Sequence, residues 1–176
     1  MFIDEATKKM ALNIIKKRLE ELLVKSVQEV VNKTERPFGL LLSGGIDSGL
    51  LVALSKPDIA LTAKFGGGEK YDEFSYARMT AKHLEIKQEV WEIDKEQFDI
   101  YFPEAVQALG EITTHFSLVP LFLLFKRAKE LGLKTLLSAE GPDEYLGGYA
   151  SYTFILHDQK LYEQEELKNY HPALDK

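Results

Sequence analysis

The chain has 176 residues, of which 45% are hydrophobic and 28% are charged, values that are ordinary for one globular domain. Its 22 Lys and Arg against 28 Asp and Glu give a net charge of −6, which argues against nucleic acid or an anionic membrane surface as a partner. The sequence contains no cysteine, which excludes disulfides, thiolate metal sites and a cysteine nucleophile within this chain. Residues 1–5 lack the layout of a signal peptide and no apolar run reaches membrane-spanning length, so we expect a cytoplasmic protein.

The first half of the chain is predicted to hold a long helix and then two strand–helix units. Apolar residues recur every three or four positions through residues 4–33, the pattern of an amphipathic helix that packs against a sheet or a partner. The apolar run 38–42 predicts a strand buried on both faces, and a helix is expected at 46–54 after a glycine-rich loop. The second unit has a predicted strand at 59–65 and a predicted helix at 73–84.

The second half continues the alternation. It predicts a strand at 87–93, a helix at 94–108 that Pro103 breaks or kinks, a helix at 119–131 and a strand at 135–139. Asp94 and Gln97 have capping-box spacing at the start of the first of these helices. The expected fold is therefore α/β, an open and mainly parallel sheet with helices on both faces, Rossmann-like. We expect one domain over residues 1–157, with the long N-terminal helix included, and a polar tail at 158–176.

Glycine-containing strings follow the first and the fourth predicted strands, at the sheet edge where ligands of such folds bind. In the first string, Gly44 and Gly45 permit a tight turn whose amides can face phosphate oxygens. The following helix adds its positive N-terminal end, and Ser43 and Ser48 add hydroxyl groups. This combination predicts a phosphate-binding loop.

Asp47 lies within the same string, where its carboxylate would repel a phosphate unless a cation lies between them. Magnesium fits, because it binds one or two protein carboxylates and completes its shell with phosphate oxygens and water. Asp143, in the string after the fourth strand, is the expected second carboxylate. The loop is not a Walker P-loop, since no Lys–Ser or Lys–Thr pair follows a second glycine at that motif's spacing.

The string LLSGGIDS at residues 41–48 resembles the pyrophosphate loop of the N-type ATP pyrophosphatases, the PP-loop superfamily. The string LSAEGPDEYLGGY at residues 137–149 resembles the branch of asparagine synthetases and β-lactam synthetases in particular. The resemblance implies an adenine nucleotide alpha hydrolase-like fold. It also implies that ATP and Mg2+ activate a carboxylate substrate as an acyl-adenylate, that pyrophosphate leaves, and that ammonia or an amine then forms an amide.

The resemblance also implies a role for individual residues. Glu140 would face the acyl centre, Glu111 would lie near the substrate pocket, and Asp143 would act with Asp47 as a magnesium ligand. The residues expected to bind the nucleotide are Leu41, Ser43, Gly44, Gly45, Asp47, Ser48, Ala63, Lys64, Ala139 and Gly141. Ala139 departs from the family pattern, which usually has glycine there, and it places a methyl group near the nucleotide.

Compared with the family, the chain is expected to be a shortened form without the glutaminase domain and without the helical region that carries a catalytic lysine. Nitrogen would then come from free ammonia, from a substrate amine or from a separate glutaminase subunit. The oligomeric state of the chain stays open, and a homo-oligomer is one alternative. Two other functions remain open: a catalytically incomplete module that binds ATP or AMP or regulates a partner, and another PP-loop enzyme such as a tRNA-modifying ATP pyrophosphatase.

Overall fold

The computed structural model describes residues 5–66, 73–111, 115, 117–149 and 152. The chain divides into two compact units, residues 1–138 and residues 139–176. The single domain predicted over residues 1–157 stays a prediction, and the predicted tail at 158–176 lies outside the described residues.

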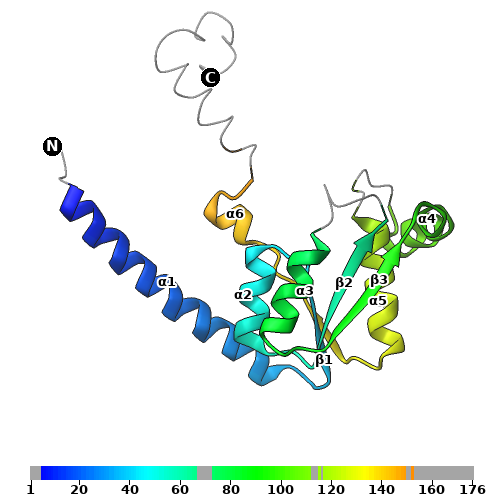
Figure 1. Cartoon of the computed structure of the whole chain (residues 1–176), viewed down its shortest axis with the longest axis horizontal. Coiled ribbons are helices and arrows are strands. Elements are labelled where there is room, and N and C mark those ends of the chain that lie inside the picture. The colour runs from blue at the N-terminus through cyan, green and yellow to red at the C-terminus, as the bar shows by residue number, and fades with distance from the viewer. Residues whose placement is uncertain (1–4, 67–72, 112–114, 116, 150–151, 153–176) are drawn as a thin grey trace, which may run out of the picture. The chain divides into compact units, whose positions relative to one another are not determined.

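A four-stranded parallel sheet forms the centre of the first unit (Figure 1). Its strands are β1 (Phe38–Leu41), β2 (Ile59–Phe65), β3 (Gln88–Ile93) and β4 (Thr135–Leu137). The order is β3-β2-β1-β4, so β1 has β2 on one side, where Leu40 pairs with Ala60, and β4 on the other, where Leu40 pairs with Leu137. The predicted open parallel α/β fold is therefore confirmed.

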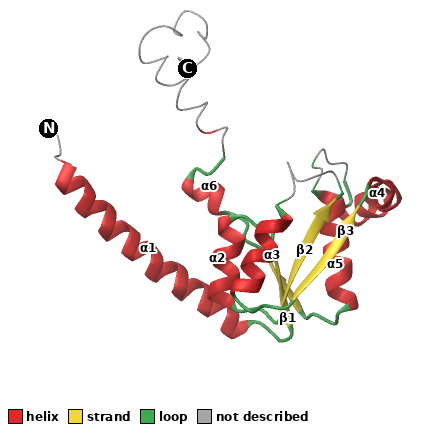
Figure 2. Ribbon diagram, viewed as in Figure 1, coloured by secondary structure: helices red, strands yellow, loops and turns green. Residues whose placement is uncertain are grey.

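Helices cover both faces of the sheet (Figure 2). They are α2 (Ile46–Ser55), α3 (Phe74–His83), α4 (Lys95–Leu109) and α5 (Leu118–Glu130). Successive strand residues point to opposite faces, so Leu40 and Leu42 pack with Val52 of α2 and Ala77 of α3, whereas Leu41 joins the apolar cluster of α5 on the other side. β1, in which residues 38–40 are buried and Leu41 is half-buried, is thus held between two apolar layers.

The helix α1 (Glu5–Lys33) precedes the sheet and contacts α2. Its Val27 and Val31 are half-buried, but much of its apolar surface is exposed. The predicted long helix is therefore present. No helix within the described residues combines the length and the apolarity needed to cross a membrane.

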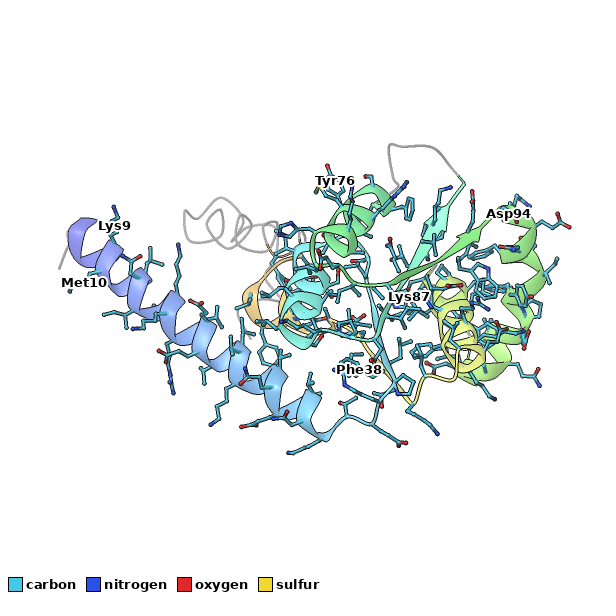
Figure 3. The ribbon with its side chains drawn as sticks, turned by 60° about the horizontal axis from the view of Figure 1, so that its bottom comes forward. Lys9, Met10, Phe38, Tyr76, Lys87 and Asp94 are labelled. Atoms are coloured by element: carbon cyan, nitrogen blue, oxygen red, sulfur yellow. The ribbon has the colours of Figure 1, made fainter. Side chains whose placement is uncertain are left out.

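Two features differ from the sequence predictions. Pro103 does not break the predicted helix, because α4 is continuous from Lys95 to Leu109. Asp94 is the N-cap residue of α4 (Figure 3), and its Oδ1 accepts the Gln97 amide at 2.8 Å, as the spacing predicted. The fourth strand ends at Leu137 rather than at residue 139. A short helix, α6 (Pro142–Leu146), then forms in the second unit, where Pro142 occupies a first-turn position that requires no amide donor.

Candidate nucleotide-binding site

The first glycine loop follows β1, the strand at which the strand order of the sheet reverses. From β1 the chain proceeds outward to β2 and β3, and it then returns to add β4 on the opposite side of β1. In open parallel sheets, ligands bind beyond the carboxyl ends of the two strands that flank such a switch point. The loop that begins at Ser43 leaves β1, and the second motif follows β4, so each of these two strands leads into one of the two motifs.

A closed set of hydrogen bonds shapes the loop between β1 and α2. The Ser43 amide donates to Ser48 Oγ at 3.3 Å, and the Gly45 amide donates to Ser43 Oγ at 3.2 Å. The Ser48 hydroxyl donates to the Gly45 carbonyl at 3.1 Å, so Ser43 is the donor in the 3.0 Å contact between the two hydroxyls. Both serines therefore build the turn itself, with Ser48 buried and Ser43 exposed.

The loop leads directly into the N-terminal end of α2. Gly45 occupies the N-cap position, and it has no side chain with which to cap the helix. Helix geometry leaves the amides of Ile46, Asp47 and Ser48 without partners inside the helix. These donors and the helix dipole make the end of α2 suited to an anion.

Gly44 fits the loop tightly against the start of α3. Its φ of +102° lies in the region that favours glycine. A Cβ atom at this position would collide with the carbonyl oxygen of Glu73 and would lie 3.1 Å from the Ala77 amide nitrogen. The missing side chain therefore lets two segments that are distant in sequence make close backbone contact.

Asp47 is half-buried in the first turn of α2. Within the part of the chain that the structure describes, its carboxylate has no hydrogen bond or ion pair, and no group of three His, Cys, Asp or Glu could hold a metal by itself. A free carboxylate beside unpaired amides is the donor set that suits a cation shared with a phosphate, rather than a metal held by protein ligands alone.

Two polar side chains, the buried Thr62 and the half-buried Gln88, support the strand that carries the loop. Thr62 of β2 is 1% exposed, and its hydroxyl donates to the carbonyl of Leu42 at 2.8 Å. Gln88 of β3 donates from Nε2 to the same hydroxyl at 2.9 Å. Leu42 also donates its own amide to the Leu61 carbonyl at 2.9 Å. The residue before Ser43 is therefore held through its carbonyl and its amide.

We predict that Thr62→Val, which keeps the side-chain shape and removes the hydroxyl, lowers the free energy of unfolding by about 1 to 3 kcal/mol. The reason is that the Gln88 amide loses its buried acceptor and the Leu42 carbonyl loses its donor. Urea denaturation measures the change. Thr80→Val on α3 is the matched control, because the structure shows no hydrogen bond from that hydroxyl to any described residue. Equal effects of the two substitutions would contradict the prediction.

The other nucleotide-binding residues predicted in the first unit have structural contacts of their own. Leu41 and Ala63 pack in the apolar cluster on the α5 side of the sheet. Lys64 points to the other side, where its Nζ lies 3.1 Å from Glu92 Oε1 and 5.8 Å from the centre of the Phe74 ring. Their predicted contacts with adenosine stay predictions.

The second motif is described within its own unit. Ala139 and Glu140 precede Gly141, which has a φ of +102° and is the N-cap residue of α6, and Asp143 lies in the first turn of that helix. The Asp143 carbonyl accepts the amides of Gly147 and Gly148 at 2.9 and 3.0 Å, which closes the turn at the helix end. The roles predicted for Ala139, Glu140, Gly141 and Asp143 stay predictions.

A tyrosine and a carboxylate in this unit share a short hydrogen bond. The Tyr149 hydroxyl donates to Glu144 Oε1 at 2.7 Å. The bond lowers the pKa of Glu144, and it raises the pKa of Tyr149 to about 12. Both effects keep the pair in the donor and acceptor states that the hydrogen bond requires.

Glu111 follows Gly110, which ends α4 with a φ of +82°. Its side chain is exposed. Its predicted place near a substrate pocket stays a prediction.

The parallel sheet, its switch point and the loop between β1 and α2 define the chain as an α/β protein of the PP-loop type. A protein-family model described as asparagine synthase matches residues 18–174. The chain therefore belongs to the asparagine synthase family, as the two motifs predicted.

Curated relatives agree with this assignment. A protein of Methanocaldococcus jannaschii, named as a glutamine-hydrolysing asparagine synthetase, is 31% identical over 94% of this chain and 32% of its own length. Asparagine synthetase 2 of Oryza sativa subsp. japonica, also glutamine-hydrolysing, is 28% identical over 86% of this chain and 27% of its own length. The chain thus spans about a third of the length of these relatives, or less.

Solved structures share the fold. The NH3-dependent NAD synthetase of Campylobacter jejuni has a TM-score of 0.53 and 23% identity over 76% of this chain and 60% of that one. The glutamine-dependent NAD+ synthetase of Acinetobacter baumannii, solved with ADP, has a TM-score of 0.52 and 21% identity over 73% of this chain and 26% of that one. The sheet and its helices therefore have the architecture of PP-loop synthetases.

Proposed function

We propose that this chain binds ATP at the loop formed by residues 43–48 and activates a carboxylate as an acyl-adenylate for amide formation. The observation that carries the proposal is the loop itself: three amides without helical partners follow a turn in which Ser43 and Ser48 fix the backbone. The loop lies after β1 at the switch point of a sheet shared with PP-loop synthetases, one of which was solved with ADP.

The loop suits pyrophosphate better than adenine. Its exposed side chains are those of Ser43 and Ile46, the amides at the start of α2 have no partners inside the helix, and the helix dipole of α2 favours negative charge at this end. Phosphate oxygens accept several hydrogen bonds at once and carry the charge that such a site neutralises. We therefore assign the β- and γ-phosphates of ATP to residues 43–48.

Mg2+ fits the same site through Asp47. The carboxylate has no described protein partner, and magnesium commonly takes one or two protein carboxylates together with phosphate oxygens. When bound, the ion would offset the charge of the pyrophosphate group. Asp143 stays the predicted second ligand.

The chemistry that follows needs no covalent bond to the protein. A carboxylate oxygen of the substrate attacks the α-phosphorus of ATP, the bond to the β-phosphate oxygen breaks, and pyrophosphate leaves with the bonding electron pair. An amine then attacks the acyl carbon, AMP leaves, and the amine gives up a proton. The residues of the loop hold pyrophosphate as its charge increases, which stabilises the transition state.

Exchange of labelled pyrophosphate into ATP tests the proposal. Asparagine is the amide of aspartate, so L-aspartate is the first acid to test, followed by a panel of amino-acid and aliphatic carboxylates. We expect exchange that requires an acid and Mg2+, because acyl-adenylate formation is reversible. The Glu140→Gln variant tests the residue predicted at the acyl centre, and it should reduce exchange while ATP binding measured by calorimetry is retained.

A second function has its own outcome in the same experiment. If ATP binds at the loop but no acid supports exchange, the chain is a nucleotide-binding module without turnover. If ATP does not bind and the chain remains folded, both the synthetase and the module are excluded.

A further inference from the structure

Two adjacent glycines follow α6 in the second motif, and the proposed function gives neither of them a role. Gly147 is the C-cap residue of α6 and has a φ of +73°, a conformation that favours glycine. The φ of Gly148 lies outside that region, so the backbone conformation does not require glycine there. What the missing side chain of Gly148 would meet supplies the explanation instead.

The carboxylate of Asp143 occupies the space beside Gly148. A Cβ atom at residue 148 would overlap Asp143 Oδ1 and would lie 2.9 Å from Asp143 Cγ. The next neighbour is Asp143 Cα at 3.3 Å, a distance that a shift of a few tenths of an ångström relieves. The absence of a side chain at residue 148 therefore leaves room for one group in particular, the carboxylate of Asp143.

Two connections hold Gly148 close to Asp143. The Gly148 amide donates to the Asp143 carbonyl at 3.0 Å. The Tyr149 hydroxyl donates to Glu144 Oε1 at 2.7 Å, so the residue after Gly148 is bonded to the residue after Asp143. The Tyr149 carbonyl in turn accepts the Tyr152 amide at 3.0 Å. Because the backbone of the turn is held in this way, a methyl group at residue 148 displaces the Asp143 side chain.

The Asp143 carboxylate has no protein partner of its own among the described residues. Its side chain is half-buried, whereas Glu144 and Tyr145 beside it are exposed. Neither carboxylate oxygen accepts a hydrogen bond or forms an ion pair with a described residue. A carboxylate that is oriented by the surrounding turn and not neutralised by a protein group suits Mg2+, which requires its oxygen ligands at near-octahedral positions.

We propose that Gly148 is a positioning residue, whose missing side chain lets the Asp143 carboxylate keep the orientation in which it binds Mg2+. This inference rests on the proposed function, in which Asp143 is the second magnesium ligand. Gly148 does not bind the ion but acts through Asp143. The contacts that orient the carboxylate all lie within residues 143–152 of the second unit, so the ligand is preorganised by its own turn.

ATP binding with and without Mg2+ tests Gly148→Ala. In the wild type we expect Mg2+ to tighten ATP binding at least about tenfold. In Gly148→Ala this ratio should fall about tenfold, because groups that orient a metal ligand typically contribute at least about that factor to metal affinity. ATP binding without Mg2+ should be unchanged, since the substitution alters no charge. Calorimetric titrations of the full chain measure both values.

Gly147→Ala is the matched control, because it places a methyl group on the adjacent residue of the same turn. The nearest atom to its Cβ would be Tyr152 Cδ2 at 3.8 Å, an ordinary contact, so the Asp143 carboxylate keeps its place. The φ of +73° makes this substitution the more strained of the two. It should nevertheless retain the effect of Mg2+. A purely structural role of the two glycines predicts the opposite order, with the larger loss in Gly147→Ala.

The χ1 rotamer of Asp143, measured by NMR scalar couplings without ATP, shows directly whether the carboxylate moves. The rotamer should change in Gly148→Ala and should stay the same in Gly147→Ala. An unchanged rotamer in Gly148→Ala would overturn the positioning role.

Asp143→Asn separates this inference from the proposed function. If Mg2+ does not affect ATP binding in the wild type, or if Asp143→Asn retains the effect, then the predicted magnesium ligand is wrong and the role of Gly148 is wrong with it. If Asp143→Asn loses the effect but Gly148→Ala retains it, only the positioning role is overturned. Loss of the effect in both variants, together with its retention in Gly147→Ala, is the expected result.

Discussion

Gly44→Ala is expected to lower the free energy of unfolding by about 2 to 4 kcal/mol, the largest effect of a single methyl group in the loop. The φ of Gly44 is +102°, a conformation that an alanine adopts only with strain. The new Cβ would also collide with the Glu73 carbonyl, which already accepts the Tyr76 and Ala77 amides at 3.1 Å. Thermal and urea denaturation measure the loss.

Gly45→Ala is the control for this prediction. Gly45 has an ordinary φ of −69°, and the nearest atom to an added Cβ is Ser43 Oγ at 3.4 Å. The substitution should therefore change stability by less than about 0.5 kcal/mol. It should still weaken ATP binding if phosphate lies against the loop, because the methyl group projects from an exposed position. Equal stability of the two variants would show that α3 does not constrain Gly44.

This difference between adjacent glycines illustrates what sequence patterns can predict. The apolar run of β1 and the glycine string that follows it predicted a strand and a turn, because both signals are local. The pattern did not show that Gly44 meets α3, since this contact depends on how two separate helices pack against one sheet. The position of a glycine in a turn is readable from sequence, but the segment that approaches it is not.

The support beneath the loop was missed for the same reason. Thr62 is a polar residue within the apolar run of β2, and a polar residue at such a position indicates a buried hydrogen bond. Its partners Leu42 and Gln88 are 20 and 26 residues away, and only the register of three strands brings them together. A propensity rule also failed locally, because Pro103 is accommodated inside α4 without a break.

Asp47→Asn should remove most of the dependence of ATP binding on Mg2+ while the fold is retained. In the wild type we expect Mg2+ to tighten ATP binding at least about tenfold, since a carboxylate beside a polyphosphate binds the ion with it. In the variant this ratio should fall below about twofold. Pyrophosphate exchange should fall at least about 100-fold, because charge on the leaving group is no longer offset. Calorimetric titrations with and without Mg2+, together with exchange assays, measure these effects.

Asp58→Asn is a matched control with the opposite result. Asp58 precedes β2 at the other end of the sheet, where Oδ1 lies 2.7 Å from Arg36 Nη1 and Oδ2 accepts the Phe38 amide at 2.9 Å. Its loss should lower stability by about 1 kcal/mol, because the ion pair is largely exposed, and should leave the effect of Mg2+ on ATP binding unchanged. Asp47 has no described partner to lose, so Asp47→Asn should cost less than about 1 kcal/mol through the dipole of α2. The proposed role would be wrong if Asp47→Asn lowered stability strongly but left the effect of Mg2+ on ATP binding unchanged. That outcome would show that Asp47 stabilises the fold and does not bind the metal.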